Sequence, residues 1–414
     1  MSYAPDQLQE FSSAQTATLL RSNNIADGTL NFRDVQFVPI SNVDDKQILK
    51  EGDVAVCMSN GSKALVGKAG RFSARSGKFT VGAFCSIFRP DSDANDRFVS
   101  YVFQSRGYRK HLDVTLAGSA INNLRNHDLE LYRLKIPPAQ EQAKIAQILD
   151  ILDTQIRQTE ALIAKLEHIK QGLLTDLLTR GIDENGQLRP PPEEAPNLYK
   201  DSPLGWIPRE WDVQLLDQVA KRGSGHTPSK SVPAYWNGGV KWVSLADSPR
   251  LDQVYIESSD KEISDLGIAN SSATKHAAGT VILSRDAGIG KSAILASEMA
   301  VSQHFMAWRC GSNLYNLFLY YWLQWMKPRF EAIALGSTIQ TIGLGYFRNL
   351  RIWVPPRNEQ DLIGDRLFEI ERQIHRNKQL LVKMTEQKTG LMDDLLTGHV
   401  RVTPLLETAK QAYG

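Results

Sequence analysis

The chain has 414 residues, a net charge of +2, and 42% hydrophobic and 23% charged residues, the composition of a globular protein with room for two or three domains. No window approaches eighteen consecutive apolar residues, and the N-terminus lacks a basic segment followed by an apolar one, which argues against a membrane-spanning or secreted protein. Three cysteines without a CxxC pair favour a reduced, cytosolic compartment and argue against a zinc site.

The first part of the chain, residues 1–137, is expected to form a mixed domain. Apolar runs bounded by turn residues predict strands within four segments: 16–25, 52–59, 78–88 and 129–137. Apolar and aromatic residues at helical spacing predict a short helix over roughly 97–112. Pro137 and Pro138 end the last strand, because proline neither donates to a strand ladder nor fits a helix interior.

A long helix is predicted over 138–181. Ten positions that alternate by four and three residues hold eight large aliphatic side chains, the heptad pattern of a helix that packs along another helix. Adding 218 to each number gives a second seam with the same pattern inside residues 357–399. The predicted helix-pairing residues are Ile145, Leu149, Leu152, Ile156, Ile163, Leu166, Leu173, Leu177, Ile363, Leu367, Ile370, Ile374, Leu381, Met384, Leu391 and Leu395.

Polar residues interrupt the two seams at the same places, Thr159 with Asn377 and Lys170 with Lys388. The two lysines have two interpretations. They fix the register of an antiparallel helix pair, a known use of polar residues in coiled coils. Alternatively they lie where the helices diverge and extend their stems along apolar surface.

A polar, proline-rich linker over 182–203 leads to a second mixed domain, 204–356. Its predicted strands 241–246, 279–285 and 350–356 correspond to strands of the first half, and an aromatic helix from Tyr315 to Phe330 corresponds to the shorter helix. GSAINNL at Gly118 and GSTIQTI at Gly336 match at the same offset of 218. The predicted fold is α+β, with two mixed domains separated by two long antiparallel helices that form a coiled coil, and with a pseudo-twofold internal repeat.

The tail after the second helix, residues 400–414, aligns without gaps to 211–225. Matched residues include Val402 with Val213. We therefore expect a circular permutation, in which the tail supplies the opening strand of the domain formed by residues 1–137. A truncated gene start is the alternative.

Positive charge is concentrated in one segment of each half. Six cations and no acidic residue between Val54 and Pro90 give +6, and five cations against Asp247 between Ala220 and Arg250 give +4. Such patches supply phosphate contacts; ordinary solvated cations are the alternative interpretation. The candidate DNA-binding residues are Lys63, Lys68, Arg71, Arg75, Lys78, Lys221, Arg222, His226, Lys230, Tyr235, Arg285 and Lys291.

Motifs for catalysis are weak in this sequence. DAGIGKS (286–292) has Arg285 where a P-loop requires glycine, and no NPPY-like tetrapeptide of an amino-methyltransferase occurs. A nuclease built from Glu51, Asp53 and Lys63 is conceivable, but that arrangement is common by chance. The sequence predicts no catalytic residue, no metal ligand and no cofactor.

Several motifs occur in a recognisable order. LYKDSPLGWIPREWDVQLLDQVAK (198–221) resembles the opening of a target-recognition domain in type I restriction-modification specificity subunits. IPPAQEQAKIAQILDILD (136–153) and VPPRNEQDLIGDRLFEIE (354–371) resemble the start of the conserved helices of that family. GLLTDLLTRGI (172–182) and GLMDDLLTGHV (390–400) resemble the ends of those helices.

The resemblance implies a non-catalytic reader of double-stranded DNA whose two recognition domains each contact one half of an asymmetric, bipartite target. It also implies that the helices dock two methyltransferase subunits, which methylate adenine with S-adenosylmethionine, and that restriction motor subunits can join them. No membrane partner is implied. The alternatives are the recognition part of a fused or nuclease-bearing restriction enzyme, and a coiled-coil scaffold that does not bind DNA.

Overall fold

The computed structural model describes residues 8–9, 11–26, 28–117, 122–334 and 341–413. The chain divides into two compact units. Unit 1 comprises Met1–Ala161 and Gln379–Gly414, and unit 2 comprises Leu162–Lys378. Each unit is described separately below.

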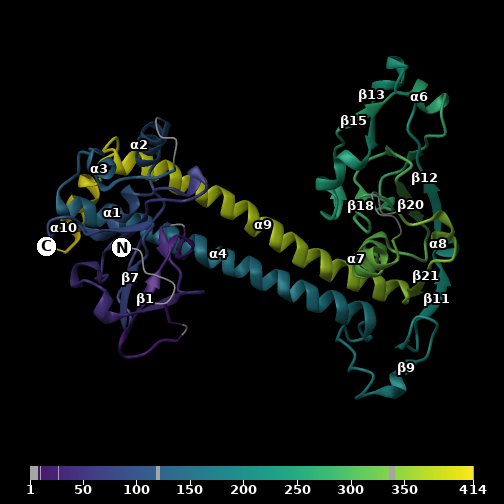
Figure 1. Ribbon diagram of the computed structural model, residues 1–414. Coiled ribbons are helices and arrows are strands. Elements are labelled where there is room, and N and C mark those ends of the chain that lie inside the picture. Colours follow the sequence, from purple (N-terminus) through teal and green to yellow (C-terminus); the bar gives the residue numbers. More distant parts are fainter. Residues whose placement is uncertain (1–7, 10, 27, 118–121, 335–340, 414) are drawn as a thin grey trace. The chain divides into compact units, whose positions relative to one another are not determined.

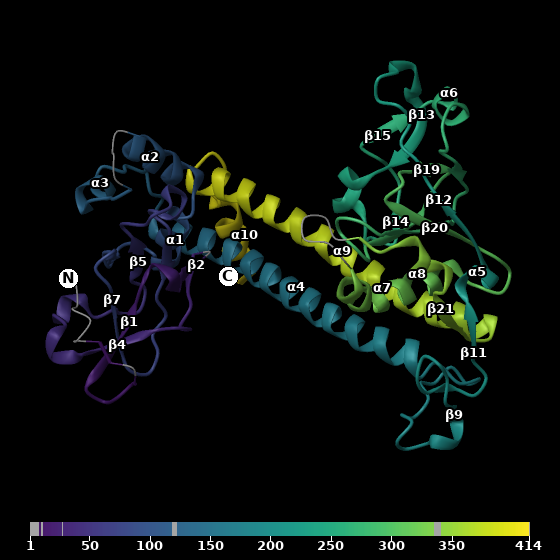
Figure 2. The ribbon, with the colours of Figure 1, turned by 45° about the vertical axis from the view of Figure 1, so that its right-hand side comes forward.

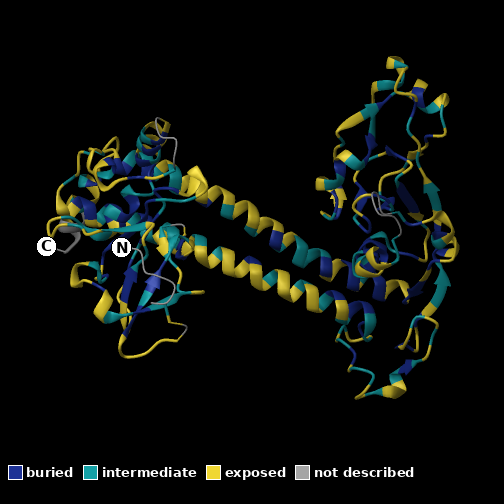
Figure 3. Cartoon of the chain, viewed as in Figure 1, coloured by how far each residue is buried: buried dark blue, intermediate teal, exposed yellow. Residues whose placement is uncertain are grey.

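Two long helices contribute to both units: α4 spans Ala139–Thr179 and α9 spans Arg357–Leu396 (Figures 1 and 2). Each helix follows a proline pair, which is tolerated before the first turn because those amides have no intrahelical acceptor. None of the sixteen aliphatic seam residues is exposed, whereas most positions between them are (yellow in Figure 3). The heptad seams therefore face protein.

The two helices run antiparallel within each unit. In unit 2, Glu167 pairs with Lys378 and Lys170 with Glu371, so residue numbers rise on one helix as they fall on the other. In unit 1, Lys388 of α9 pairs with Asp153 of α4. Each of the two seam lysines, Lys170 and Lys388, thus forms an ion pair with a carboxylate of the facing helix.

Unit 1 contains two small three-stranded sheets and a two-stranded ribbon. Their strands are β1 (Thr16–Leu20), β2 (Ile25–Ala26), β3 (Thr29–Leu30), β4 (Gln36–Pro39), β5 (Val54–Cys57), β6 (Ala69–Arg71), β7 (Lys78–Val81) and β8 (Cys85–Phe88). The first sheet has the order β4-β1-β7, with β1 antiparallel to β4 and parallel to β7. The second has the order β6-β5-β8 and is antiparallel. In addition to parts of α4 and α9, unit 1 contains the helices α1 (Asp96–Val102), α2 (Arg106–Ala117), α3 (Asn126–Glu130) and α10 (Thr403–Tyr413).

Unit 2 contains larger sheets. Its strands are β9 (Tyr199–Lys200), β10 (Ile207–Pro208), β11 (Asp212–Leu215), β12 (Ala220–Ser224), β13 (Trp236–Val243), β14 (Tyr255–Ile256), β15 (Lys261–Ile263), β16 (Lys275–His276), β17 (Val281–Ser284), β18 (Ser292–Leu295), β19 (Met299–Val301), β20 (Phe305–Cys310) and β21 (Arg351–Val354). They form sheets β12-β20-β17-β18-β14 and β15-β13-β19-β16, with pairs β11-β21 and β9-β10. The shorter helices are α5 (Leu216–Val219), α6 (Asp265–Ala269), α7 (Asn316–Ile333) and α8 (Leu344–Arg348).

The two units repeat one topology. The triplet β4-β1-β7 corresponds to β15-β13-β19, since each has one antiparallel and one parallel neighbour beside its middle strand. The triplet β6-β5-β8 corresponds to β18-β17-β20, and Val54 and Val281 open the equivalent middle strands in the same register. The α+β prediction with two long helices and an internal repeat is therefore confirmed.

Two expected strands of unit 1 are absent from the described residues. The strand predicted over 129–137 is not formed, although its counterpart β21 in unit 2 pairs with β11. The tail expected to supply the β11 equivalent is helical from Thr403 onward, as α10. Pro404, which aligns with Leu215 of β11, has no amide hydrogen for a ladder and is tolerated in the first turn of a helix. Without a partner strand from the tail, residues 129–137 have no neighbouring strand with which to pair.

Two further boundaries differ from the prediction. The run 78–88 is divided into β7 and β8, which belong to different sheets. The helix expected over 97–112 is divided into α1 and α2, and Asn95 caps the first of them by accepting a hydrogen bond from the amide of Phe98. Loop residues between the elements therefore turn the chain where periodicity alone predicted continuity.

Candidate nucleic-acid interface

Part of the basic segment of unit 1 is exposed. Lys63 lies in the turn after β5, Arg75 lies in the turn before β7, and Lys78 is the first residue of β7. The Arg75 guanidinium is 4.0 Å from the centre of the Phe32 ring, a cation–π contact that holds the charge at the surface. Lys68 is half-buried. These four side chains are available to an anion.

Arg71, a predicted DNA-binding residue, forms ion pairs within unit 1. Its guanidinium pairs with Glu51 and Asp96, and its side chain is only 16% exposed. Arg89 likewise pairs with Asp53, whose side chain is 1% exposed. These contacts satisfy buried or half-buried carboxylates, so both arginines stabilise the unit. Glu51 and Asp53, the carboxylates of the conceivable nuclease, are occupied by the same contacts.

In unit 2 two like charges face each other across neighbouring strands. Lys221 of β12 lies directly opposite Arg309 of β20, and both side chains are exposed. Like charges at directly opposed positions destabilise a sheet. A bound anion would remove that repulsion. The neighbouring Arg222 points elsewhere and pairs with Asp217 at 3.2 Å.

The loop before β13 holds three more predicted residues. His226 and Lys230 are exposed and Tyr235 is half-buried. The amide of His226 donates to the carbonyl of Val301 and its own carbonyl accepts from the Trp242 indole, so this loop is fastened to the sheet. It therefore presents its side chains from a fixed backbone.

Arg285 and Lys291 are engaged within unit 2. The Arg285 guanidinium donates to the carbonyls of Gln303 and Ile342 and is 20% exposed. The Lys291 ammonium donates to the carbonyl and hydroxyl of Ser248. Both side chains therefore hold backbone segments of unit 2 together.

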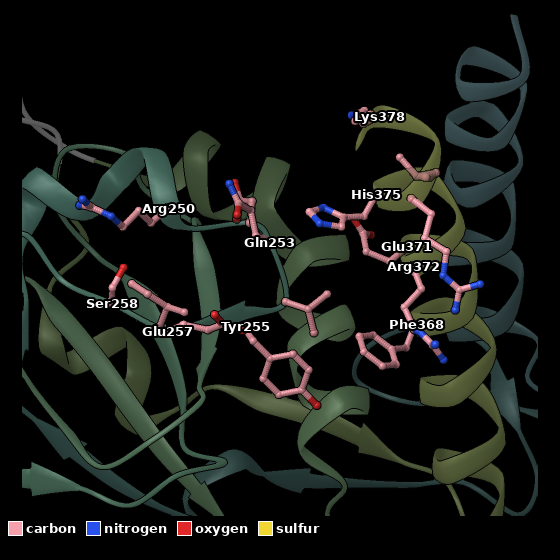
Figure 4. A pocket seen from close by; sticks show the side chains of 15 residues that line it. Arg250, Gln253, Tyr255, Glu257, Ser258, Phe368, Glu371, Arg372, His375 and Lys378 are labelled. Atoms are coloured by element: carbon pink, nitrogen blue, oxygen red, sulfur yellow. The ribbon is translucent and has the colours of Figure 1, made fainter. Parts of the chain in front are cut away.

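A groove of about 700 Å³ in unit 2 was missed by the sequence prediction (Figure 4). It lies between the segment around β14 and α9, and Tyr255 and Phe368 meet edge to face at its base, with ring centres 5.7 Å apart. Its basic lining residues are Arg250, Arg372, His375, Arg376 and Lys378. The basic run in 371–378 was the available signal, but its position on the groove depends on how the domain packs against the helix.

Acidic residues of the groove are largely paired. Asp252 accepts from Lys327, and Glu371 pairs with Lys170. Glu257 is the remaining acidic lining residue. Arg250, Arg372 and Lys378 are paired as well, with Asp247, Glu369 and Glu167. The groove is therefore lined by ion-paired residues of both signs.

The long helices also expose apolar side chains outside the seams. Leu162 of unit 2 is 43% exposed, and Leu380 of unit 1, its counterpart at the offset of 218, is 47% exposed. An equivalent leucine on each unit is thus left uncovered. A single exposed leucine is ordinary on a protein surface; what distinguishes these two is that they recur at the repeat offset.

Reactive or metal-binding groups are scarce. Within the described ranges no group of three His, Cys, Asp or Glu side chains could hold a metal ion. Burial raises the pKa of the Cys85 thiol to about 12, and that of Cys57 is raised for the same reason, so neither is an activated nucleophile. No helix in the described parts has the length and hydropathy needed to cross a membrane.

Comparison with known proteins identifies relatives along both halves. The model of a family described as "Type I restriction modification DNA specificity domain" matches residues 27–168 and 208–385. The StySPI specificity subunit of Salmonella potsdam, a type I restriction enzyme component, is 24% identical over 99% of this chain and 91% of its own length. A putative MjaX specificity subunit of Methanocaldococcus jannaschii is 24% identical over 93% and 87%, respectively.

Solved structures with the same fold are also found. The type I restriction-modification S subunit from M. genitalium superposes with a TM-score of 0.56 at 14% identity, covering 95% of this chain and 91% of that one. A chain from a study of type I R-M assembly and conformational transition gives a TM-score of 0.53 at 16% identity, covering 94% and 93%. At these identities the likeness concerns the fold.

Proposed function

Because this chain belongs to the type I restriction-modification DNA specificity family, we propose that it is the specificity subunit of such a system and reads DNA for partner enzymes. Its target is double-stranded and bipartite, with one half-site for the recognition domain in each unit. The two domains share a topology but differ in sequence, so the two half-sites differ and the target is asymmetric.

The observation that carries the proposal is the duplication itself. Two sheets of the same topology recur in both units, and each half matches the DNA specificity domain model. A single binding domain would need no second copy of the scaffold. Two copies suit a ligand with two recognition elements.

Phosphate contacts are assigned to exposed cations and to the half-buried Lys68. In unit 1 these are Lys63, Lys68, Arg75 and Lys78, and in unit 2 they are Lys221, Lys230 and Arg309. His226 and Tyr235, on the fastened loop that also carries Lys230, are assigned to a groove of the duplex. Arg71, Arg222, Arg285 and Lys291 act as positioning residues, because each already binds a carboxylate or a backbone segment. Phosphate contacts fix the position of the duplex without reading sequence.

The chain itself is not a catalyst in this proposal, and the transfer of a methyl group to adenine is left to two methyltransferase subunits. The exposed leucines Leu162 and Leu380 supply equivalent contacts for two copies of one partner. Restriction motor subunits can join the same complex. Methyl donor is required by the partners and not by this chain.

The proposed domain limits follow the sequence prediction, with recognition domains at 1–137 and 204–356, conserved helices at 138–181 and 357–399, and a linker at 182–203. The tail, 400–414, is proposed to complete the first domain, as the helix α10 and not as the expected opening strand. Val402 is buried beside Ile145 and Leu149.

A repeated glutamate further supports this role for the tail. Glu141 is bound by Arg401 of the tail. Its counterpart in the second helix, Glu359, is bound by Arg189 and by the indole of Trp211. Segments that lead out of the two long helices thus reach equivalent carboxylates.

The test is methylation mapping with the chain and its methyltransferase partner together. The proposal expects one asymmetric bipartite sequence with methylated adenines, and no methylation by either component alone. Methylation by this chain without a partner would establish the fused-enzyme alternative. Failure of the complex to retain DNA at low salt would establish the scaffold alternative.

A further inference from the structure

The two units carry equivalent side-chain clusters at the ends of their equivalent strands β5 and β17. In unit 1 the amide of Met58 donates to the carbonyl of Phe84 at 2.7 Å. In unit 2 the amide of Arg285 donates to the carbonyl of His304 at 2.9 Å. An equivalent backbone hydrogen bond therefore forms directly after each of the two strands. This makes Phe84 the counterpart of His304.

The next residue of each segment also forms an equivalent β-bridge. Ser59 bridges to Asn123 in unit 1, and Asp286 bridges to Thr341 in unit 2, both in antiparallel sense. Asn123 and Thr341 are related by the same offset of 218 as the helix repeat. Three positions in each unit are thus placed by one backbone scaffold.

The framework beneath these positions keeps its chemistry. Val54, Val56, Val66, Gly67 and Lys68 of unit 1 correspond to Val281, Leu283, Ile289, Gly290 and Lys291 of unit 2. Gly67 and Gly290 share a φ of +80°, a conformation that favours glycine. The residue types at the cluster positions differ between the units. Ser59 corresponds to Asp286, Phe84 to His304, and Asn123 to Thr341.

In unit 2 the cluster is a hydrogen-bonded network. His304 Nδ1 donates to Asp286 at 2.7 Å, and the Thr341 hydroxyl donates to the other oxygen of that carboxylate. The Asp286 side chain is 9% exposed and the His304 ring 33% exposed. His304 Nε2 lies 3.3 Å from the amide nitrogen of Gln303, whose oxygen accepts from Thr227. The buried carboxylate therefore orients an imidazole and a neighbouring amide at the surface.

In unit 1 the same place presents an aromatic side chain. Phe84 is 67% exposed, and Asn123 beside it is exposed as well. The neighbouring Asn122 donates its side-chain amide to the carbonyl of Gly61, which fixes the turn that carries Lys63. Phe84 lies in the turn between β7 and β8, and the Met58 amide holds its carbonyl. The aromatic side chain is therefore presented to solvent from a fixed backbone.

We propose that these clusters read bases in the two half-sites, an inference that rests on the proposed function. The backbone scaffold is common, so the clusters approach DNA in the same way, and the side chains set which base is accepted. Phe84 makes the apolar contact to a thymine methyl group, with the Asn123 amide beside it suited to adenine. His304 and Gln303 bind the major-groove edge of adenine, because Asp286 is the positioning residue that keeps the imidazole proton on Nδ1 and leaves Nε2 to accept from the adenine amino group.

The experiment compares the methylated sequences made by the complex of this chain with its methyltransferase subunits. Phe84→Ala is expected to relax one position of the first half-site by about tenfold, the discrimination of one good base contact, while the second half-site stays unchanged. His304→Ala is expected to relax only the second half-site. Asp286→Asn is expected to weaken the same position as His304→Ala, and His304→Gln to restore part of the preference.

Matched controls are Phe11→Ala in unit 1 and Trp206→Ala in unit 2, which remove exposed aromatic side chains, 79% and 55% exposed, away from the clusters. Thermal melts establish that each variant folds. Unchanged half-sites in folded Phe84→Ala and His304→Ala complexes would overturn the inference and leave the proposed function intact. A wild-type complex without any sequence preference would overturn the proposed function itself.

Discussion

The ammonium group of Lys388 on α9 lies 2.5 Å from a carboxylate oxygen of Asp153 on α4, and both side chains are largely buried, at 17% and 20% exposure. The second copy of the repeat contains an equivalent pair, since Lys170 pairs with Glu371. In one copy the lysine lies on α9 and the carboxylate on α4, and in the other copy the lysine lies on α4 and the carboxylate on α9. The seam lysines therefore form ion pairs across the helix contact, as expected of register-fixing residues.

Replacing Asp153 by alanine is expected to destabilise unit 1 by about 1–3 kcal/mol, because a largely buried pair is worth more than a surface pair and less than a fully buried one. Tyr101 also loses a hydrogen-bond acceptor in this variant. Urea unfolding measures the change. Asp153→Ala combined with Lys388→Met removes both charges and should recover part of the loss; an equal or larger loss in the double variant would contradict the register role.

Replacing Lys63, Lys68 and Arg75 together by glutamate is expected to weaken DNA binding by the complex and to lower the salt slope of log K by about 0.9 for each phosphate that the protein no longer binds. The two half-site sequences should stay the same, because phosphate contacts carry no sequence information. Binding isotherms at several salt concentrations measure the slope. Arg71→Gln is the comparison, since it should lower stability more than it lowers the slope.

Acid should weaken the attachment of the tail in unit 1. The guanidinium of Arg401, hydrogen-bonded to Glu141, holds the pKa of that carboxyl below its ordinary value. A carboxyl whose pKa is lower in the folded state stabilises fully above the unfolded pKa, and this stabilisation is lost as pH falls through the folded pKa. Glu141→Gln should therefore lower the melting temperature by about 2–4 °C near neutral pH, and the difference from wild type should disappear in acid.

The outcome that would contradict this is a difference between the two proteins that does not depend on pH. Deletion of residues 400–414 provides an independent check, because it also removes the buried Val402. It should lower the stability of unit 1 and leave unit 2 unchanged.

Lengthening both helices by one heptad should lengthen the spacer between half-sites. Seven residues inserted after Ala161 and seven after Lys378 preserve the seam and add about 10 Å at 1.5 Å per residue. The methylated target should then gain about three base pairs of spacer, at 3.4 Å per base pair, with both half-sites unaltered. An unchanged spacer would show that the helices do not set the distance.

Leu162→Glu and Leu380→Glu should each remove one methyltransferase subunit from the complex, because each places a charge in one of two equivalent apolar contacts. The molar mass of the complex, measured by light scattering, should fall by one partner for either variant and by two for the double variant. Val114→Glu, at a 71% exposed position outside the long helices, is the matched control. A full complement of partners in the double variant would place docking elsewhere.

The sequence by itself determined the two long helices, the repeat and the family. Heptad spacing is a local pattern, and a helix of 41 residues expresses it without reference to distant contacts. An offset of 218 that recurs in the two seams, in the motifs at their ends, and at Gly118 and Gly336 is likewise legible without coordinates. Mixed strands with a Pro-Pro boundary before each helix indicated the domains for the same reason.

Only the tertiary structure decided which charges are available and which strands form. Arg71 looked like its basic neighbours until folding brought Glu51 and Asp96 to it from 20 and 25 residues away. The 129–137 run has the composition of a strand, but a strand needs a partner, and the tail with Pro404 is helical instead. The clusters at Phe84 and His304 depend on backbone bonds between segments far apart in sequence. Ion pairs, strand pairing and side-chain clusters are properties of contacts, which the folded chain alone defines.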